Sequence, residues 1–244
     1  NYKKSTPILK NIKCINQLFK DGHTIKIFTA RYMGRTNDNP LIAKKRAKVT
    51  TINQLKKWRV NYHKIFFGKP IITHVIKLLI KSKIFDKIIV STDSNKIAKI
   101  CERSGAEILF KRPKSLAGDY TSTNDVVKHA IVWLTKNLEK PSRVCCVYPT
   151  AVLLTIRDLK KSFIKFKSNK YDYLFSATKY SHPIQRCFYM DQDKIIMNNK
   201  KNFNKRTQDL KDYYHDVGQF YWGKTSAWLN NKIIFDKNST IQII

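Results

Sequence analysis

The chain has 244 residues, of which 48 are Lys or Arg and 17 are Asp or Glu, giving a formal charge of +31. It is 42% hydrophobic, enough to bury a core, and its length allows one large domain or two small ones. It contains no run of about 18 apolar residues, so we expect no membrane span. Residues 1–30 lack a signal-peptide pattern, although the first residue is Asn1 rather than Met.

The excess positive charge comes mostly from lysine spread along the whole chain, together with abundant Ile and Asn. All three residues have AT-rich codons, so this composition is typical of an ordinary enzyme from a low-GC genome. No Arg-rich tail or nucleic-acid motif accompanies the charge. We therefore expect no nucleic-acid partner, but a positive field that attracts anionic substrates.

Five cysteines are present, and none are in a C-x-x-C spacing: Cys14, Cys101, Cys145, Cys146 and Cys187. An odd count without metal-ligand spacing argues against a zinc site or a disulfide framework. The pattern predicts buried free thiols in a reducing cytoplasm.

The first 70 residues have the rhythm of a small α/β unit. Apolar residues at helical spacing predict a helix over 8–21, stopped by Gly22. A strand is expected at 24–29, followed by a polar loop. A short helix at 51–58 and a strand at 62–67 complete the unit.

The segment HTIKIFTARYMGR at 23–35 resembles the sugar-phosphate phosphatases of the haloacid dehalogenase superfamily. The resemblance implies that Thr29 binds a phosphoryl group at a strand end and that Lys69 is the phosphate-binding lysine. The aspartate nucleophile of that superfamily is not found here, and without it no covalent intermediate forms. We interpret residues 1–68 as a partial, inactive phosphatase-like segment; an unrelated α/β unit is the alternative.

From Lys69 onward, strand and helix patterns alternate. Helices are expected at 71–81, 95–103 (capped by Ser94), 123–138 (capped by Thr123) and from Thr155, and strands at 87–92, 106–110, 143–148 and 172–178. Apolar strands alternating with helices predict a doubly wound, mostly parallel α/β sheet. Such sheets bind ligands at the carboxyl ends of their strands.

Polar motifs follow several of these strands. STDS at 91–94 brings Asp93 to a strand end, YPT occupies 148–150, and KRPKSLAGDYTST at 111–123 carries Arg112 and several hydroxyls. The run NKRTQDLKDYYHDVGQFYWG at 204–223 is unusually rich in side chains that hydrogen-bond. It is interpreted as lining a site for a polar, anionic small molecule, with an aromatic surface hairpin as the alternative.

Residues 69–244 resemble the acylneuraminate cytidylyltransferases, which activate nine-carbon acidic sugars. The supporting motifs are GKP (68–70), FDKIIVSTDS (85–94), RPKSLAGDYTST (112–123), CCVYPTA (145–151), SHPIQR (181–186) and RTQDLKDYYHDVGQFYWG (206–223). PIQR and HDVGQFYWG favour the pseudaminic branch of the family over the sialic branch. The resemblance implies a Rossmann-like nucleotide-diphospho-sugar transferase fold with a mostly parallel sheet and flanking helices.

It also implies that CTP and the anomeric hydroxyl of the sugar acid react to release pyrophosphate, with Mg²⁺ and in a homodimer. Asp93, Arg112, Thr121 and Thr123 would bind the nucleotide, and Asp93 and Arg206 would be catalytic. The sugar acid would be surrounded by Tyr148, Thr150, Gln185, Arg186, Arg206, Gln208, Asp209, Tyr214, His215 and Gln219. Asp216 and Gly218 are assigned to turn geometry.

Two family features are not found. The loop that wraps the CTP phosphates should precede Gly68, and an acidic metal-binding motif should follow on a late strand. We therefore expect binding to be better preserved than catalysis. The change of pattern at FGKP (67–70) suggests a chimera of two neighbouring genes. A sugar-phosphate phosphatase remnant and a non-catalytic nucleotide-sugar-binding protein remain as alternatives.

Overall fold

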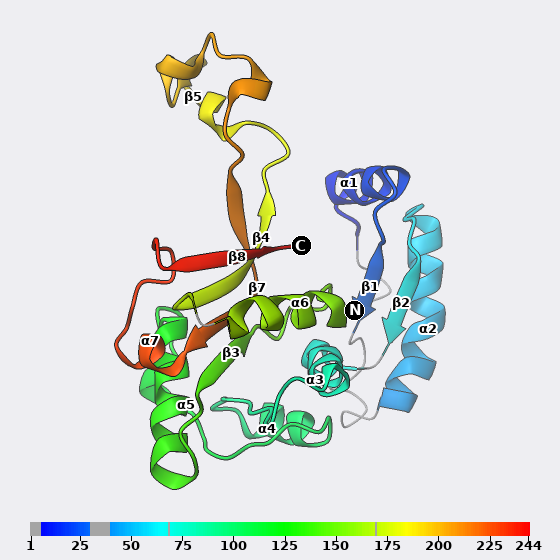
Figure 1. Ribbon diagram of the computed structural model, residues 1–244. Coiled ribbons are helices and arrows are strands. Elements are labelled where there is room, and N and C mark those ends of the chain that lie inside the picture. The colour runs from blue at the N-terminus through cyan, green and yellow to red at the C-terminus, as the bar shows by residue number, and fades with distance from the viewer. Residues whose placement is uncertain (1–5, 30–39, 68, 169) are drawn as a thin grey trace. The chain divides into compact units, whose positions relative to one another are not determined.

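The computed structural model describes residues 6–29, 40–67, 69–168 and 170–244 (Figure 1). The chain divides into two units, Asn1–Lys77 and Leu78–Ile244, and each is described by itself. The boundary falls inside helix α3, Ile71–Ser82, which matches the helix expected at 71–81. In the described part of the chain, no helix is long and apolar enough to cross a membrane.

The first unit contains the predicted order of helix, strand, helix and strand. These are α1 (Leu9–Lys20), β1 (Lys26–Thr29), α2 (Pro40–Lys57) and β2 (Lys64–Phe67). Strands β1 and β2 pair in parallel from Lys26↔Lys64 to Thr29↔Phe67. Gly22 has φ of +83°, the left-handed conformation with which glycine commonly ends a helix.

The helix predicted at 51–58 is longer than expected. Helix α2 begins at Pro40, a residue favoured in a first turn because its missing N–H needs no partner there. The polar loop expected before it falls at 30–39, outside the described residues. Two parallel strands require a crossover connection, and α2 lies within it.

The second unit is built on a four-stranded sheet in the order β3-β7-β4-β8. The strands are β3 (Arg143–Val147), β7 (Tyr214–Lys224), β4 (Tyr173–Lys179) and β8 (Ser239–Ile243). Strand β7 is antiparallel to both β3 and β4, and β8 is parallel to β4, so β3, β4 and β8 run in the same direction. The mixed α/β class is confirmed, but β7 adds an antiparallel strand that the sequence interpretation left out.

Two predicted strands are wrong. Residues 87–92 and 106–110 form only an isolated parallel bridge, Ile89↔Glu107. Backbone hydrogen bonds from Val90 N–H to Glu107 O and from Glu107 N–H to Ile88 O hold the two segments together. That pairing is too short to extend into a ladder, although it still brings the two segment ends side by side.

The remaining helices of this unit lie around the sheet (Figure 1), and all of them except α7 begin with a side-chain cap. They are α4 (Asn95–Glu102), α5 (Thr123–Asn137), α6 (Ile156–Lys167) and α7 (Thr225–Leu229), with a 3-10 turn at Lys114–Leu116. Ser94 accepts from a backbone N–H group at the start of α4, as predicted, and Thr155, expected to open a helix, instead caps α6 in the same way. The predicted cap of α5 is wrong: Ser122 is the cap, and Thr123 is the first helical residue. The Thr123 hydroxyl is therefore available for other contacts.

The core lies where α5 and α7 pack against the sheet. Trp228 and Tyr173 are both 0% exposed, with their rings edge to face at 4.9 Å. Gly223 passes so close that an added Cβ would lie 2.2 Å from Trp228 Nε1. Trp222 packs on the α6 side, where its Nε1–H donates to Ser162 Oγ at 2.9 Å.

Between β4 and β7, residues 180–213 form a segment that we call the arm. It contains the hairpin β5 (Phe188–Asp191) and β6 (Lys194–Met197) and 3-10 turns at Ile184–Arg186, Lys200–Asn202 and Thr207–Asp209. Figure 1 shows the arm projecting away from the sheet, beyond the far ends of β4 and β7.

The cysteines differ from expectation. All five are free, but Cys14 and Cys187 are exposed rather than buried. Burial raises the pKa of Cys145 well above its usual range. The Cys145 thiol on β3 is consequently held protonated, whereas Cys14 and Cys187 are open to solvent.

Candidate functional site

One group of predicted site residues gathers at the edge where β3 ends. Arg112 forms two hydrogen bonds with Ser91 of the STDS motif. Its Nε donates to Ser91 Oγ at 3.0 Å, and its Nη2 donates to Ser91 O at 2.6 Å. Burial raises the pKa of the Cys146 thiol on β3 to about 12, and the charge of Arg112 opposes that rise. Arg112 therefore holds a fixed guanidinium close to β3.

Thr123 and Tyr148 meet at the same edge. Their hydroxyl oxygens lie 2.7 Å apart, within hydrogen-bonding distance. Tyr148 directly follows β3, and its backbone N–H donates to Gln219 O on β7 at 3.0 Å. Thr123 was assigned to the nucleotide, and Tyr148 and Gln219 to the sugar acid, so the structure brings residues of both predicted groups together.

A bulge in β7 sets the position of Gln219. The β4–β7 register shifts between Phe175 and Ala177, and the buried Ser176 hydroxyl accepts from Gln219 N–H at 3.1 Å and Phe220 N–H at 3.3 Å. The Gln219 side-chain oxygen is buried without a partner among the described residues. A buried acceptor without a donor is costly, so this oxygen is suited to a ligand hydroxyl or a bound water.

Asp216 and Gly218 supply the local geometry of this bulge, in line with their assignment to turn geometry. Gly218 has φ of +59°, and its N–H donates to Asp216 Oδ1 at 2.9 Å. The other Asp216 oxygen accepts from the buried Tyr221 hydroxyl. Burial, followed by the bond to Asp216, raises the pKa of Tyr221 far above its usual range.

A second group of predicted residues lies in the arm, where they bond to one another and to the arm's own backbone. Gln185 Nε2 donates to Lys211 O at 2.6 Å, and Gln185 Oε1 is buried without a partner in the described part of the chain. Arg186 donates to Thr207 Oγ1 at 2.5 Å. Arg206 pairs with Asp209 through two hydrogen bonds of 2.8 and 3.2 Å.

The other predicted residues are scattered around these groups. Asp93, Thr150, Gln208 and Tyr214 are exposed, and Thr121 is half-buried. The exposed His215 ring lies 4.8 Å from that of Tyr180. In the first unit, Thr29 ends β1 and Lys69 is exposed.

The edge group and the arm group are separate within the second unit. Arg112, Thr123 and Tyr148 lie at the carboxyl end of β3, whereas the arm projects from the sheet beyond β4 (Figure 1). Of the two residues predicted to be catalytic, Asp93 lies two positions after Ser91, which binds Arg112, whereas Arg206 lies in the arm. Their catalytic roles stay predictions.

Sequence reasoning missed Ser91, Ser176 and Tyr221, which hold the predicted side chains in place. The signal for Tyr221 was present: 214–224 alternates along a strand, so His215, Gln219 and Tyr221 could have been assigned to a sheet. The Ser176 contact depends on a bulge, which no local pattern marks.

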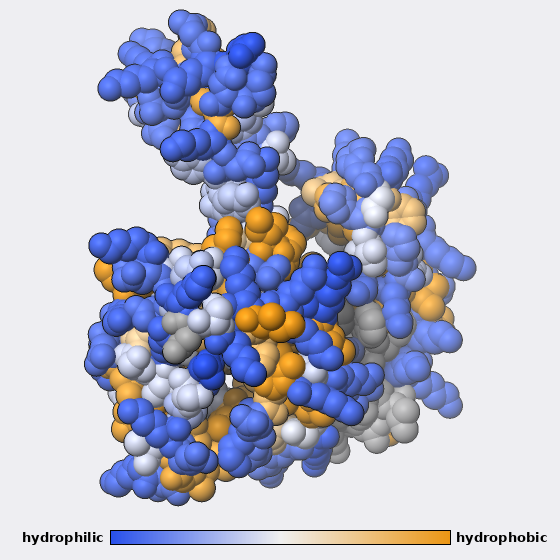
Figure 2. Space-filling view, in the orientation of Figure 1, coloured by the Kyte–Doolittle hydropathy of each residue, from blue (hydrophilic) through white to orange (hydrophobic). Residues whose placement is uncertain are grey.

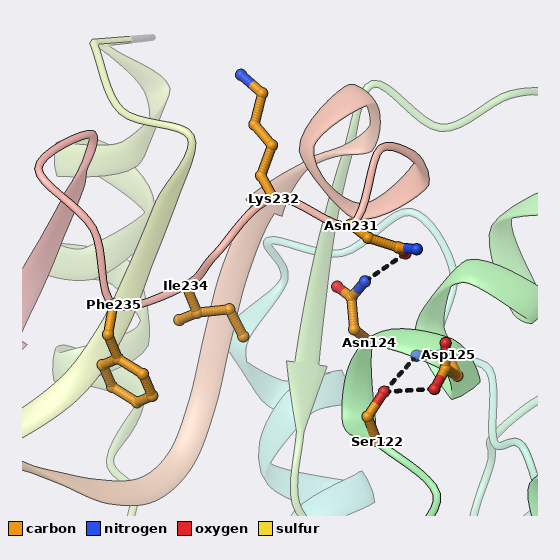
Figure 3. A pocket seen from close by; sticks show the side chains of 7 residues that line it. All are labelled: Ser122, Asn124, Asp125, Asn231, Lys232, Ile234 and Phe235. Atoms are coloured by element: carbon orange, nitrogen blue, oxygen red, sulfur yellow. Dashed lines mark hydrogen bonds between the residues drawn. The ribbon is translucent and has the colours of Figure 1, made fainter.

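A pocket of about 420 Å³ opens on another side of the α5 N-terminus (Figure 3). It is lined by Ser122, Asn124, Asp125, Asn231, Lys232, Ile234 and Phe235. Asn124 Nδ2 donates across it to Asn231 Oδ1 at 2.7 Å. Thr123 is not among the lining residues, so this hollow is distinct from the edge group.

The described residues offer little to a metal ion by themselves. Within the described ranges, no group of three His, Cys, Asp or Glu side chains lies together. Asp93, which follows the Ser91 that binds Arg112, is an exposed carboxylate. Because Mg²⁺ is commonly held by one or two carboxylates plus substrate phosphates, Asp93 fits as a ligand shared with a bound nucleotide.

Comparison with known proteins assigns the chain to a family. The cytidylyltransferase family model matches residues 61–235, so the chain belongs to the cytidylyltransferase family and is a nucleotidyltransferase. Pseudaminic acid cytidylyltransferase of Campylobacter jejuni is 38% identical over 180 residues, covering 73% of this chain and 78% of the relative.

Two further similarities are weaker. N-acylneuraminate cytidylyltransferase of Escherichia coli is 25% identical, covering 74% of this chain and 42% of the relative. The solved structure of 4-diphosphocytidyl-2C-methyl-D-erythritol synthase from Anaerococcus prevotii has a TM-score of 0.45 at 12% identity, covering 72% of this chain and 77% of that chain.

Proposed function

We propose that this chain transfers CMP from CTP to a nonulosonic acid of the pseudaminic type and releases pyrophosphate for surface-glycan synthesis. The observation that carries the proposal is the 2.7 Å contact between Thr123 and Tyr148. It joins a residue assigned to the nucleotide with one assigned to the sugar acid, as a transfer between the two requires. The 38% identity to a pseudaminic acid enzyme, against 25% to an N-acylneuraminate enzyme, supports the choice of sugar.

The reaction needs positioning and charge stabilisation more than covalent chemistry. The sugar oxygen attacks the α-phosphate, and the bond to pyrophosphate breaks. Arg112 is oriented by Ser91 before any ligand binds, so its remaining N–H groups face the nucleotide without a further loss of side-chain freedom. The partnerless oxygen of Gln219 would accept from a sugar hydroxyl.

Mg²⁺ is part of this proposal. When bound with the CTP phosphates, it neutralises their negative charge. The residue of this chain that would share it is Asp93, held at the start of α4 by the Ser94 cap.

The separation of the arm from the edge group supports a homodimer. Several large apolar side chains of the arm are exposed: Phe188, Tyr189, Met190, Ile195 and Phe203. On the face seen in Figure 2 the arm is mostly hydrophilic, with small hydrophobic patches. A two-stranded hairpin is marginally stable by itself, so a second copy that covers these patches would stabilise it. The arm's Arg206 would then complete the partner's sugar site.

Pyrophosphate release tests the function directly. The chain is mixed with CTP, Mg²⁺ and either pseudaminic or N-acylneuraminic acid. We expect turnover, or CTP-dependent binding where turnover is lost, with pseudaminic acid preferred. No binding or turnover with any nonulosonic acid would refute the proposal. Sedimentation of the same sample tests the dimer.

Two further assignments belong to this proposal. The five free cysteines support a cytoplasmic location. Residues 1–68 are proposed to be a partial phosphatase segment fused to the transferase.

A further inference from the structure

The arm leaves the sheet beside the bulge in the ladder between β4 and β7. The register shifts at Ser176, so that this single residue of β4 stands opposite residues 217–220 of β7. The last pair on the sheet side includes Tyr221, and the first pair on the arm side includes Asp216. Bulges bend a strand and increase its twist. The bulge therefore sets the direction in which the arm projects (Figure 1).

Two side chains hold the backbone of the bulge. The Ser176 hydroxyl accepts from the N–H groups of Gln219 and Phe220, at 3.1 and 3.3 Å. Asp216 Oδ1 accepts from Gly218 N–H at 2.9 Å. Ser176 and Phe220 are both 0% exposed, so an N–H group that lost its acceptor here could not bond to solvent instead. The bulge is consequently held in one conformation.

A third contact crosses the bulge from one side to the other. Tyr221, on the sheet side, donates its hydroxyl proton to Asp216 Oδ2, on the arm side. The Tyr221 side chain belongs to the core. It is 5% exposed, and its ring lies 5.5 Å from that of Tyr148 and 6.1 Å from that of Phe175. This hydrogen bond therefore connects the base of the arm to the core of the sheet.

The bulge lies between the two groups of residues assigned to the sugar acid. Gln219 is part of the bulge and borders the edge group, where its backbone oxygen accepts from Tyr148 N–H at 3.0 Å. Arg186 and Arg206 lie beyond the bulge, in the arm. A flexible connection between the two groups would have to be ordered when a ligand binds, at a cost in affinity. A connection that is already fixed avoids this cost.

We propose that three positioning residues fix the joint between the sheet and the arm: Ser176, Asp216 and Tyr221. They hold Gln219 and the arm where sugar-acid binding requires them. The inference rests on the proposed function, because it takes Gln219 and Arg206 to bind the sugar acid. The three residues act through position, since Ser176 and Tyr221 are buried and both carboxylate oxygens of Asp216 accept hydrogen bonds from the chain itself.

The first test observes the arm directly and needs no ligand. Spin labels are attached to Cys187 in the arm and at Lys160→Cys, an exposed position of α6, with Cys14→Ser removing the other exposed thiol. Dilution with unlabelled chain ensures that the measured pairs lie within one molecule. Pulsed electron paramagnetic resonance gives the distribution of distances between the labels. Tyr221→Phe, which deletes only the bridging hydroxyl, should broaden this distribution, and Ser176→Ala should broaden it further.

The matched control is Tyr173→Phe. Tyr173 is a buried tyrosine of the same sheet, it lies outside the bulge, and its hydroxyl has no partner among the described residues. Its distance distribution should match that of the unsubstituted chain. If Tyr221→Phe and Ser176→Ala also left the distribution unchanged, the joint would not depend on these side chains, and the proposal would be overturned.

The second test measures recognition by titration calorimetry of each substrate. Tyr221→Phe should bind the sugar acid roughly five- to tenfold more weakly, the effect of one hydrogen bond. CTP affinity should be nearly unchanged, because Arg112 is held by Ser91 and not by β7. Equal weakening of both ligands would overturn the positioning role. A broadened distance distribution in variants of a chain that binds no nonulosonic acid would instead refute the proposed function, and with it the role of the joint in sugar binding.

Discussion

The polar side chains at the edge of the sheet differ from those of the arm in their burial and in the elements that hold them. At the edge, Arg112, Ser176 and Tyr221 are half-buried or buried and are held by strands and helix starts that come from distant parts of the sequence. In the arm, Arg206 and Asp209 are exposed and bond to each other three residues apart. The edge is organised by strands and helix starts from across the second unit, whereas Gln185, Arg186 and Arg206 bond within the arm itself.

The proposed function gives this difference a role in recognising the two substrates. A side chain fixed before binding loses little freedom when a ligand arrives, so the edge suits the common nucleotide. An exposed pair such as Arg206–Asp209 contributes little to stability and can exchange partners. The arm therefore suits a carboxylate that replaces Asp209 on the Arg206 guanidinium, whose fork matches both carboxylate oxygens.

The contrast between the sheet and the arm is tested most strongly by replacing an aromatic side chain of the core. Trp228→Ala removes a side chain that is 0% exposed and should lower the free energy of unfolding by about 3–5 kcal/mol. Ile195→Ala in the arm is the control: Ile195 is 64% exposed, and at protein concentrations low enough to keep the chain monomeric the change should be within about 0.5 kcal/mol. Urea denaturation measures both. Similar losses in the two variants would contradict the contrast between sheet and arm.

The next prediction separates binding from stability. Arg206→Ala should weaken the sugar acid by about 1.5–3 kcal/mol, the effect of losing a charge-assisted hydrogen bond, and leave CTP affinity unchanged. Calorimetric titration of each ligand checks this. Asp209→Asn is its partner variant and should retain sugar binding, since it leaves the guanidinium available. A loss of CTP binding in Arg206→Ala would place Arg206 in the nucleotide half.

Alkaline pH should affect the sheet more than the arm. Burial raises the pKa of Cys146 and of Tyr173 to about 12 each. In the unfolded chain these groups ionise from about pH 9 and 10, so over this range the folded state binds more protons. The free energy of unfolding must then fall as pH rises from 9 to 12. Melting temperatures recorded from pH 9 to 12 test this prediction, and a melting temperature that rises with pH would contradict it.

The smallest effect is expected from Tyr173→Phe. The Tyr173 hydroxyl is buried without a partner among the described residues, so its removal costs no hydrogen bond. We expect a change near zero or a gain of up to about 1 kcal/mol at neutral pH, and a weaker alkaline loss. Tyr221→Phe provides the contrast, because Tyr221 is bonded to Asp216 and should be destabilised by the same deletion.

Local patterns predicted most of the helices but not the centre of the sheet. Helices α3, α4 and α6 lie where apolar spacing and caps indicated, because those signals act within a few residues. Strand β7 was read as a polar aromatic run. Its position between β3 and β4 follows from pairing with residues about 40 to 80 positions away.

The site was predictable to the same extent. Arg112, Thr123 and Tyr148 lie in motifs that carry the family resemblance, so the sequence singled them out. Ser91 and Ser176 were not singled out, since their hydrogen-bond partners lie 21 and 43 to 44 residues away, at separations that no sequence pattern reveals.

The exposed thiol of Cys187 gives a practical way to observe the arm. It lies directly before β5, whereas Cys145 and Cys146 are held protonated within the sheet. A maleimide dye should therefore react with the arm, and with Cys14 in the first unit, under conditions that spare the core. With Cys14→Ser removing the second position, a single fluorophore would report directly on whether the arm becomes covered as protein concentration rises.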